Sequence, residues 1–201
     1  EVIKSEVLLN LVLDDIDFEL RVFRSGKLKT IELFDQSPIS FYYKILDPDV
    51  YDKRIDIWIT DENQVELRFP DTEESVLFAI GDTLRIPEME LVVSLNDSLL
   101  KDKPYLKLDD HFQIEIISRK RLIAEAKDNL DVNAVDNDVA VIRITYKSTN
   151  PKKACIFVNS LAKAYIVDYI DYKYKAADIA VNFLDSQIDQ VFTKLVKSEK
   201  D

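Results

Sequence analysis

Glycine, histidine and cysteine are scarce in this chain, and each shortage excludes a class of functional site. Two glycines, Gly26 and Gly81, are too few for a glycine-rich phosphate loop or a dinucleotide-binding fingerprint. The one histidine, His111, excludes a multi-histidine metal centre, and we interpret it as an exposed residue at a strand end. The one cysteine, Cys155, excludes an internal disulfide and a cysteine cluster, and its helical position predicts packing.

Positive charge and long apolar runs are also in short supply. Lysine and arginine number 27 against 38 acidic residues, and the net charge of −11 argues against nucleic acid and anionic lipid as partners. No hydrophobic segment is long enough to cross a bilayer, although the 47% of hydrophobic residues can bury a core. The chain begins at Glu1, and its last residues carry no helix stop signal. We therefore expect a fragment of a longer protein.

The first half of the chain alternates polar and apolar residues and predicts strands after one short helix at 2–13. The β-rich part is expected to span 16–106. Its strands are predicted at 15–22, 28–34, 39–45, 54–60, 64–69, 75–80 and 91–95. The first two of these, joined by a turn around Gly26, predict a hairpin.

The second half predicts a β-α-β part at 107–150, made of a strand at 112–117, a helix at 118–130 and a strand at 139–146. We expect these two strands to share one core with the β-rich part. The prediction is an α+β fold, with a mixed β-sheet base packed by short helices and one long C-terminal helix that projects. The whole chain, 1–201, is expected to form a single domain.

The long helix is predicted from Thr149 onward. Asn150 can cap its free amides, and Pro151 suits the first helical position because its missing N–H needs no partner there. Apolar residues follow at spacings of three and four: Ala154, Val158, Leu161, Tyr165, Tyr169, Tyr172, Ala176, Ala180, Phe183, then Leu184, Ile188, Val191 and Leu195. A helix from 151 to 197 would extend roughly 70 Å. Part of it must project beyond a base of this size. We expect the segment 151–201 to be the start of a long helical arm.

The acidic segment 131–138, "DVNAVDND", resembles half of a calcium loop but lacks the required spacing. Counted from Asp131, the fifth position is Val135, the sixth is Asp136 in place of glycine, and the twelfth is Ile142 in place of glutamate. We interpret the segment as a solvated connection between a helix and a strand. The sequence predicts no metal site and no cofactor.

Aromatic residues leave carbohydrate binding open as a second function. The tyrosines Tyr165, Tyr169, Tyr172 and Tyr174 fit either core and subunit contacts or stacking on sugars. Trp58 faces away from Ile55, Ile57 and Ile59 and is expected on an exposed sheet face, which would suit a carbohydrate-binding β module. A hydrolase built on paired carboxylates is the third alternative, although no acidic pair has a recognisable setting.

Several short elements, taken in order, resemble those of a known family. Ser37 and Pro38, followed by Ile39, match an "sPf" element, and Pro151 and Ala154, preceded by Asn150, match a "dP..A" helix start. Further along the chain, the "N.L...Y" and "FL..Q" elements match Asn159, Leu161, Tyr165, Phe183, Leu184 and Gln187. The chain thus resembles, over nearly its whole length, the extracytoplasmic region of polysaccharide co-polymerases, the chain-length determinant or Wzz-like proteins. The branch with a cytoplasmic tyrosine autokinase is the most similar.

The resemblance implies a periplasmic domain of an inner-membrane protein, anchored by flanking segments and assembled into homo-oligomers. It implies no enzymatic activity in this segment, and a role in setting the length and export of capsular, exo- or O-antigen polysaccharide with the polymerase and export machinery. Direct contact with the glycan is left open. The candidate oligomer interface on the distal helix is formed by Phe183, Leu184, Ile188, Val191 and Leu195.

Overall fold

The computed structural model has an α+β fold, as the sequence predicts. It describes residues 2–26, 29–60, 63–70, 72, 74–103, 111–136 and 139–198. Side chains are described for all of these except 136, 139, 140 and 193–198.

The larger sheet has six antiparallel strands in the order β2-β1-β9-β4-β5-β6. These are β2 (Thr30–Glu32), β1 (Leu20–Ser25), β9 (His111–Ile116), β4 (Arg54–Ile59), β5 (Gln64–Arg68) and β6 (Ser75–Ala79). The hairpin of β1 and β2 is the one predicted around Gly26. β9 lies between β1 and β4, so the strand after the β-rich part completes the sheet which that part begins.

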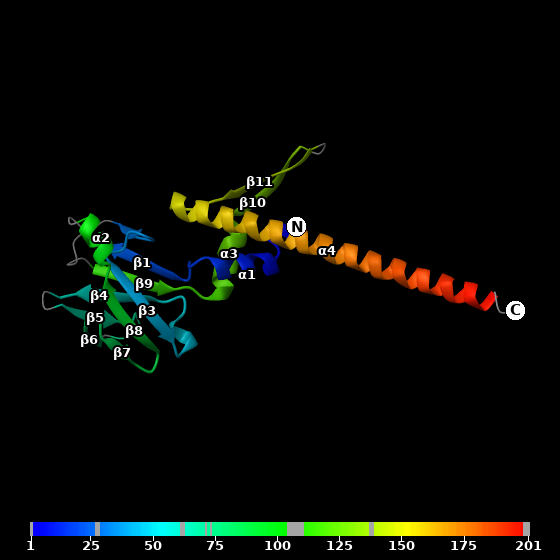
Figure 1. Cartoon of the computed structure of the whole chain (residues 1–201). Helices are drawn as coiled ribbons and strands as arrows, with labels where there is room; N and C mark the ends of the chain where they lie inside the picture. The colour runs from blue at the N-terminus through cyan, green and yellow to red at the C-terminus, as the bar shows by residue number, and fades with distance from the viewer. Residues whose placement is uncertain are drawn as a thin grey trace.

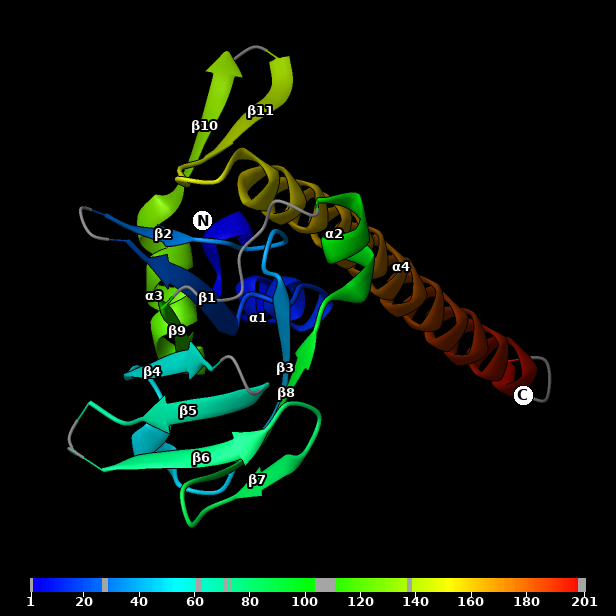
Figure 2. The same cartoon turned by 90° about the vertical axis from the view of Figure 1, so that its left-hand side faces the viewer.

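A second sheet of three strands faces the first one (Figure 2). It contains β3 (Ile39–Ile45), β8 (Met89–Leu95) and β7 (Thr83–Arg85), and β7 has no counterpart in the sequence prediction. Every second side chain along these strands points between the two sheets, where it joins one apolar cluster shared by both. Ile57 on β4, Leu91 on β8 and Phe112 on β9 are fully buried members of this cluster. Each such buried side chain contributes about 1.5–3 kcal/mol. The 3-10 turn η2 (Pro48–Val50) and the short helix α2 (Asp97–Asp102) connect these strands.

A separate apolar cluster holds the helices together. It joins the 3-10 turn η1 (Val2–Lys4), α1 (Glu6–Asp15), α3 (Arg119–Asn129) and the first turns of α4 (Pro151–Ser198). Ser5 caps α1, since its side chain accepts a hydrogen bond of 3.3 Å from the amide of Leu8. Ile16 and Phe18, predicted as strand residues, precede β1 as extended chain and are buried in this helical cluster.

The strands β10 (Leu130–Asp136) and β11 (Val139–Tyr146) form a two-stranded hairpin that stands out from the base (Figures 1 and 2). The prediction of a loop at 131–138 is therefore wrong for 131–136, while 137 and 138 lie outside the described residues. The expectation that both strands share one core with the β-rich part holds for β9 and is wrong for β11. Ile144 and Tyr146 of β11 pack against the helical cluster, and β11 pairs only with β10 within the described part of the chain.

Helix α4 begins against the base and then leaves it as a straight projection, which we call the arm and define as residues 166–198 (Figure 1). Every described side chain from Ile166 to Phe192 is exposed. Among the described residues, no helix is both long and apolar enough to cross a membrane.

Candidate functional site

The root of α4, which we define as residues 150–165, is fixed to the base by a cap and a buried stripe. The Asn150 side-chain oxygen accepts hydrogen bonds from the amides of Lys152 (3.0 Å) and Lys153 (3.4 Å). These two amides belong to the first turn, where no helical carbonyl can serve them. The start of α4 is thus capped by the residue that directly precedes it.

The buried stripe of the root differs from the one that the sequence predicts. Lys153, Phe157 and Leu161 are 6%, 0% and 0% exposed and point into the helical cluster, whereas Ala154 and Val158 are half-buried. The ring of Phe157 stacks on that of Tyr146, with centroids 4.0 Å apart. The predicted stripe is thus shifted by one residue at Phe157, because the root packs mainly against α1 and β11.

Lys153 brings a positive charge into this cluster. Its ammonium donates a hydrogen bond of 2.6 Å to Glu32 on β2 and lies 4.9 Å from the ring centroid of Phe18 and 5.5 Å from that of Phe34. Burial lowers the pKa of Lys153, and the Glu32 carboxylate only partly offsets that effect. Lys152 forms a second ion pair with Asp35, on the segment after β2. The two lysines therefore connect the first turn of α4 to β2 and the residues that follow it.

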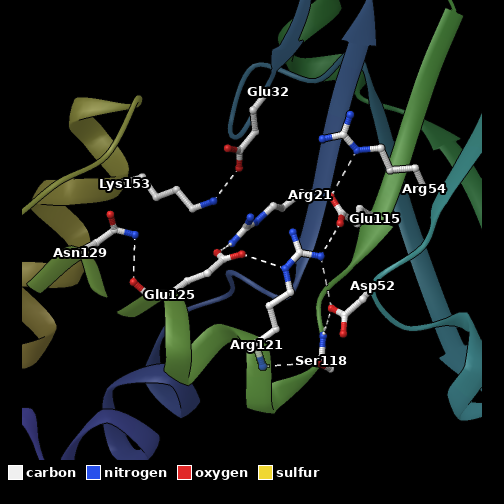
Figure 3. A network of polar contacts seen from close by, with 10 residues as sticks. All are labelled: Arg21, Glu32, Asp52, Arg54, Glu115, Ser118, Arg121, Glu125, Asn129 and Lys153. Atoms are coloured by element: carbon white, nitrogen blue, oxygen red, sulfur yellow. Dashed lines mark hydrogen bonds and ion pairs between the residues drawn. The ribbon is translucent and has the colours of Figure 1, made fainter. Parts of the chain in front are cut away.

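A network of arginines and carboxylates continues from this contact into the base (Figure 3). Glu125 on α3 binds both Arg21 on β1 and Arg121, the latter at 2.9 Å. Arg121 also binds the buried Glu115 on β9 at 2.6 Å, and Arg54 on β4 reaches the same carboxylate at 3.5 Å. The network joins α3 to three neighbouring strands of the six-stranded sheet, and so connects the two apolar clusters.

The pKa of Glu125 reflects these partners. Burial alone would raise it, but the hydrogen bonds and charges of Arg21 and Arg121 outweigh burial, and the pKa is lowered. The pKa of Asp52 is lowered in the same way, because burial is outweighed by bonds from Ser118 and the charge of Arg121. Both carboxylates are therefore held in the ionised form that an ion-pair network requires.

The arm itself presents apolar side chains to solvent along its whole described length. Their exposed fractions range from 45% to 70%. They are Ile166, Val167, Tyr169, Ile170, Tyr172, Tyr174, Ile179, Val181, Phe183, Leu184, Ile188, Val191 and Phe192. Leu195 lies in the same helix, but its side chain is outside the described ones. Contiguous apolar surface on this scale is typical of a protein–protein contact site.

The other residues singled out from the sequence are scattered over the base. Ser37 is buried, and its hydroxyl donates a hydrogen bond of 2.5 Å to the carbonyl of Ile39. The carbonyl of Pro38 accepts from the amide of Asn96, so this pair fixes the start of β3 against the end of β8. Asn159 is exposed and donates to the sulfur of Cys155 at 3.4 Å. Cys155 is exposed too, so the predicted packing role is wrong: it faces away from the buried stripe.

Trp58 and His111 lie on the outer face of the six-stranded sheet. Their rings stack at 4.6 Å between centroids, and the Arg68 guanidinium lies 4.7 Å from the indole centroid. His111 is the first residue of β9, as predicted, but its side chain is only 29% exposed and bonds Asp56 at 2.7 Å. Because β9 and β5 flank β4 on opposite sides, the two neighbours approach the indole from opposite directions. Little of its ring face is left for a sugar.

A metal centre finds no support in the described residues, where no group of three or more His, Cys, Asp or Glu side chains could hold an ion. Asp131 lies on β10, and its carboxylate accepts a hydrogen bond of 2.6 Å from the side-chain amide of Asn133. The sequence analysis missed both Lys153 and the arginine network. Lys153 and its partner Glu32 are 121 residues apart in the chain, so no local pattern relates them. The arm is the feature of this molecule that most clearly calls for a partner.

Comparison with known proteins gives a distant relative that matches part of the chain. No protein-family model matches the chain. The chain is 24% identical over 141 residues to a Klebsiella pneumoniae protein described as a candidate tyrosine-protein kinase in the cps region. The match covers 69% of this chain and 20% of that protein, so the chain spans about a fifth of the relative's length.

Two solved structures of the flagellar protein FlgL are also similar. The protein from Xanthomonas campestris is 10% identical, with a TM-score of 0.27, over 72% of this chain and 41% of that one. The junction protein from Legionella pneumophila is 15% identical, with a TM-score of 0.31, over 82% of this chain and 53% of that one. Scores this low carry no conclusion about fold or function.

Proposed function

We propose that this chain is a non-enzymatic assembly module of a polysaccharide co-polymerase of the cell envelope. In this role it modulates the chain length and export of capsular or related polysaccharide, as a periplasmic domain held to the inner membrane by flanking segments. The observation that carries the proposal is the arm, a helix that leaves the base with its apolar side chains uncovered. Exposed apolar surface of this kind on a helix marks a site where partner helices bind.

The relative supplies the biological setting. A protein of the cps region is associated with capsule polysaccharide, and the order of short elements around Ser37, Pro38 and Pro151 resembles the chain-length determinant family. The kinase activity in the relative's description belongs in this proposal to a part of the protein outside the 20% that matches. Partners of the intact protein would be further copies of itself and the polymerase and export machinery.

The two alternatives from the sequence receive less support. A carbohydrate-binding module would need an open aromatic face, and the indole of Trp58 is approached by His111 and Arg68 from either side. A hydrolase would need two carboxylates free to act on a glycosidic bond. Glu115 and Glu125, which Arg121 brings near each other, are instead bound to arginines.

The experiment uses the full-length protein in membranes, with Leu184→Asp and Ile188→Asp combined on the arm. Carboxylates placed at these exposed apolar positions would oppose helix packing without touching the base, so we expect smaller oligomers and an altered length distribution of the exported polysaccharide. The matched control combines Asn182→Asp and Ser186→Asp, which add the same charge at polar positions of the same helix. Unchanged oligomers and unchanged polysaccharide lengths in the apolar-site variant would contradict the proposal.

A glycan titration separates the carbohydrate-binding alternative. The purified chain is titrated with oligosaccharides of the repeat unit, with Trp58→Ala as the matched variant. The assembly module predicts no saturable binding that depends on Trp58. Binding lost in the variant would favour the alternative.

A further inference from the structure

The arm carries a seven-residue repeat that begins where α4 leaves the base. From Val167 onward, apolar residues follow one another at alternating steps of three and four, without interruption, up to Leu195. The first position of each heptad, a, is occupied by Val167, Tyr174, Val181, Ile188 and Leu195. The fourth position, d, is occupied by Ile170, Ala177, Leu184 and Val191. We call these nine residues the seam.

The seam is uncovered in the single chain. Val181, Leu184, Ile188 and Val191 are 55%, 58%, 64% and 56% exposed. A repeat of seven drifts by about 20° per heptad around a straight α-helix, so it makes one continuous contact only when two helices coil around each other. A helix lying on a globular base would show the ordinary period of 3.6 residues, as the root of α4 does. The seam therefore fits another helix of the same repeat.

The charges beside the seam indicate which helix that is. The e positions of the first three heptads are acidic, Asp171, Asp178 and Asp185, and that of the fourth is Phe192. The g position of the first heptad is Lys173. In a parallel pair of identical helices, the g residue of one heptad meets the e residue of the partner's next heptad, which brings Lys173 opposite Asp178. In an antiparallel pair, e positions meet e positions, and aspartates would face aspartates. Identical arms are thus compatible with each other in the parallel orientation.

A second apolar stripe, on the other face of the arm, does not continue in the same way. It runs through Tyr169, Tyr172, Ala176, Ile179 and Phe183 and then reaches Ser186 and Gln190, which are polar. Phe183 belongs to this stripe and not to the seam, although both are exposed. The two stripes can thus be tested separately, residue by residue.

We infer that the arms of two copies of this chain pair in parallel and in register along 167–195, as a left-handed coiled coil built on the seam. The inference deepens the proposed function, on which it rests, by naming the partner of the arm, its orientation and its register. Other occupants, an antiparallel copy or an unrelated helix, give different results in the tests below.

The first test is disulfide cross-linking in a Cys155→Ser background, which removes the one native thiol. In a parallel, in-register pair, the two copies of a d position face each other, within reach of a disulfide. Ala177→Cys is at d, and its neighbour Ala176→Cys is at c, on the opposite face. We expect mild oxidation to give several-fold more covalent dimer from Ala177→Cys than from Ala176→Cys. Equal yields, or a higher yield from Ala176→Cys, would overturn the inference.

The second test is a charge exchange, read as the dimer dissociation constant from analytical ultracentrifugation at low salt. Lys173→Asp should weaken self-association about threefold to tenfold, because it replaces two exposed ion pairs by repulsion. The double variant Lys173→Asp with Asp178→Lys should restore it, since the same pair is rebuilt in the opposite sense. Lys175→Asp, at position b outside the seam, is the matched control and should leave self-association unchanged. A double variant no tighter than Lys173→Asp would overturn the parallel register.

Failure of this inference can be told apart from failure of the proposed function. Cross-linking and charge exchange measure only how two arms meet, whereas the Leu184→Asp and Ile188→Asp experiment measures polysaccharide length. Polysaccharide lengths altered in that experiment, together with equal cross-linking of Ala176→Cys and Ala177→Cys, would reject the parallel seam and leave the assembly role in place.

Discussion

Branched aliphatic side chains have opposite surroundings in the base and in the arm. Ile55 and Ile57 on β4 are fully buried between the two sheets, whereas Ile179 and Ile188 on α4 are 70% and 64% exposed. The base is held together by contacts within its own chain. The described side chains of the arm from Ile166 to Phe192 are all exposed, although tertiary packing normally supplies most of a helix's stability. The comparison teaches that the same residue types serve folding in one region and remain available for association in the other.

The largest expected effect on stability comes from removing a buried phenylalanine of the base, compared with removing an exposed one of the arm. Phe157→Ala removes a fully buried ring that stacks on Tyr146, and should lower the free energy of unfolding by about 3–5 kcal/mol. Phe183→Ala, its matched control on the arm, is 62% exposed and should change it by less than about 0.5 kcal/mol. Urea unfolding of the isolated chain, followed by far-ultraviolet circular dichroism, measures both. Equal losses would mean that the arm is packed in solution.

A smaller effect is expected from the ion-pair network between α3 and the sheet. Because the folded-state pKa of Glu125 is lowered below its ordinary value of 4.5, its contribution is fully present above that value and is lost as pH falls through the folded pKa. Glu125→Gln should cost about 1–2 kcal/mol at neutral pH through weakened bonds to Arg21 and Arg121.

The measurement is the urea midpoint of both proteins from pH 7 down to pH 3. Glu125→Gln should lose less stability than the parent on acidification, since one of the carboxylates that must be protonated is gone. Asp168→Asn, an exposed position of the arm outside the seam and its e and g positions, is the control, and its acid dependence should match that of the parent. Parallel curves for Glu125→Gln and the parent would contradict the assigned role of the network.

The smallest effect is expected at the boundary between the two regions. Asn150→Ala removes the acceptor for the first amides of α4 and should cost about 1 kcal/mol. Asn159→Ala, an exposed change within the same helix, should be neutral or slightly stabilising because alanine is the better helix former. Thermal unfolding of the two variants gives the comparison. A neutral Asn150→Ala would show that tertiary contacts, and not the cap, set the start of α4.

Local patterns in the sequence were sufficient to predict most elements but few of their pairings. Period-two alternation predicts β3, β4 and β5 because each has one face in a core, and the cap at Asn150 predicts the start of α4. The insertion of β9 between β1 and β4 could not be predicted, since it joins segments about 60 to 90 residues apart and no local signal encodes that order. β7 and α2 are too short to give a clear period.

The errors of prediction in the second half also have physical causes. Asp131 and Asn133 are typical loop residues, but they alternate with Leu130 and Val132, and that alternation is the signal of β10. Lys153 is expected at a surface because of its charge, and only the tertiary position of Glu32 makes its burial possible. The projection of the arm was predictable because a helix of roughly 70 Å is longer than the base. The partner of its apolar residues was not, because periodicity shows which residues share a face and not what covers it.

The contact of Lys153 with Glu32 has a mechanical consequence for the arm. From Ile166 to Ser198 the helix runs for roughly 50 Å, and every described side chain along it is exposed. The helix is held to the base at its root. A tilt of the helix by about 10° at the root displaces its far end by roughly 9 Å, which is about the distance between the axes of two packed helices. In the proposed assembly, a tilt of this size would decide whether neighbouring tips touch or stand apart.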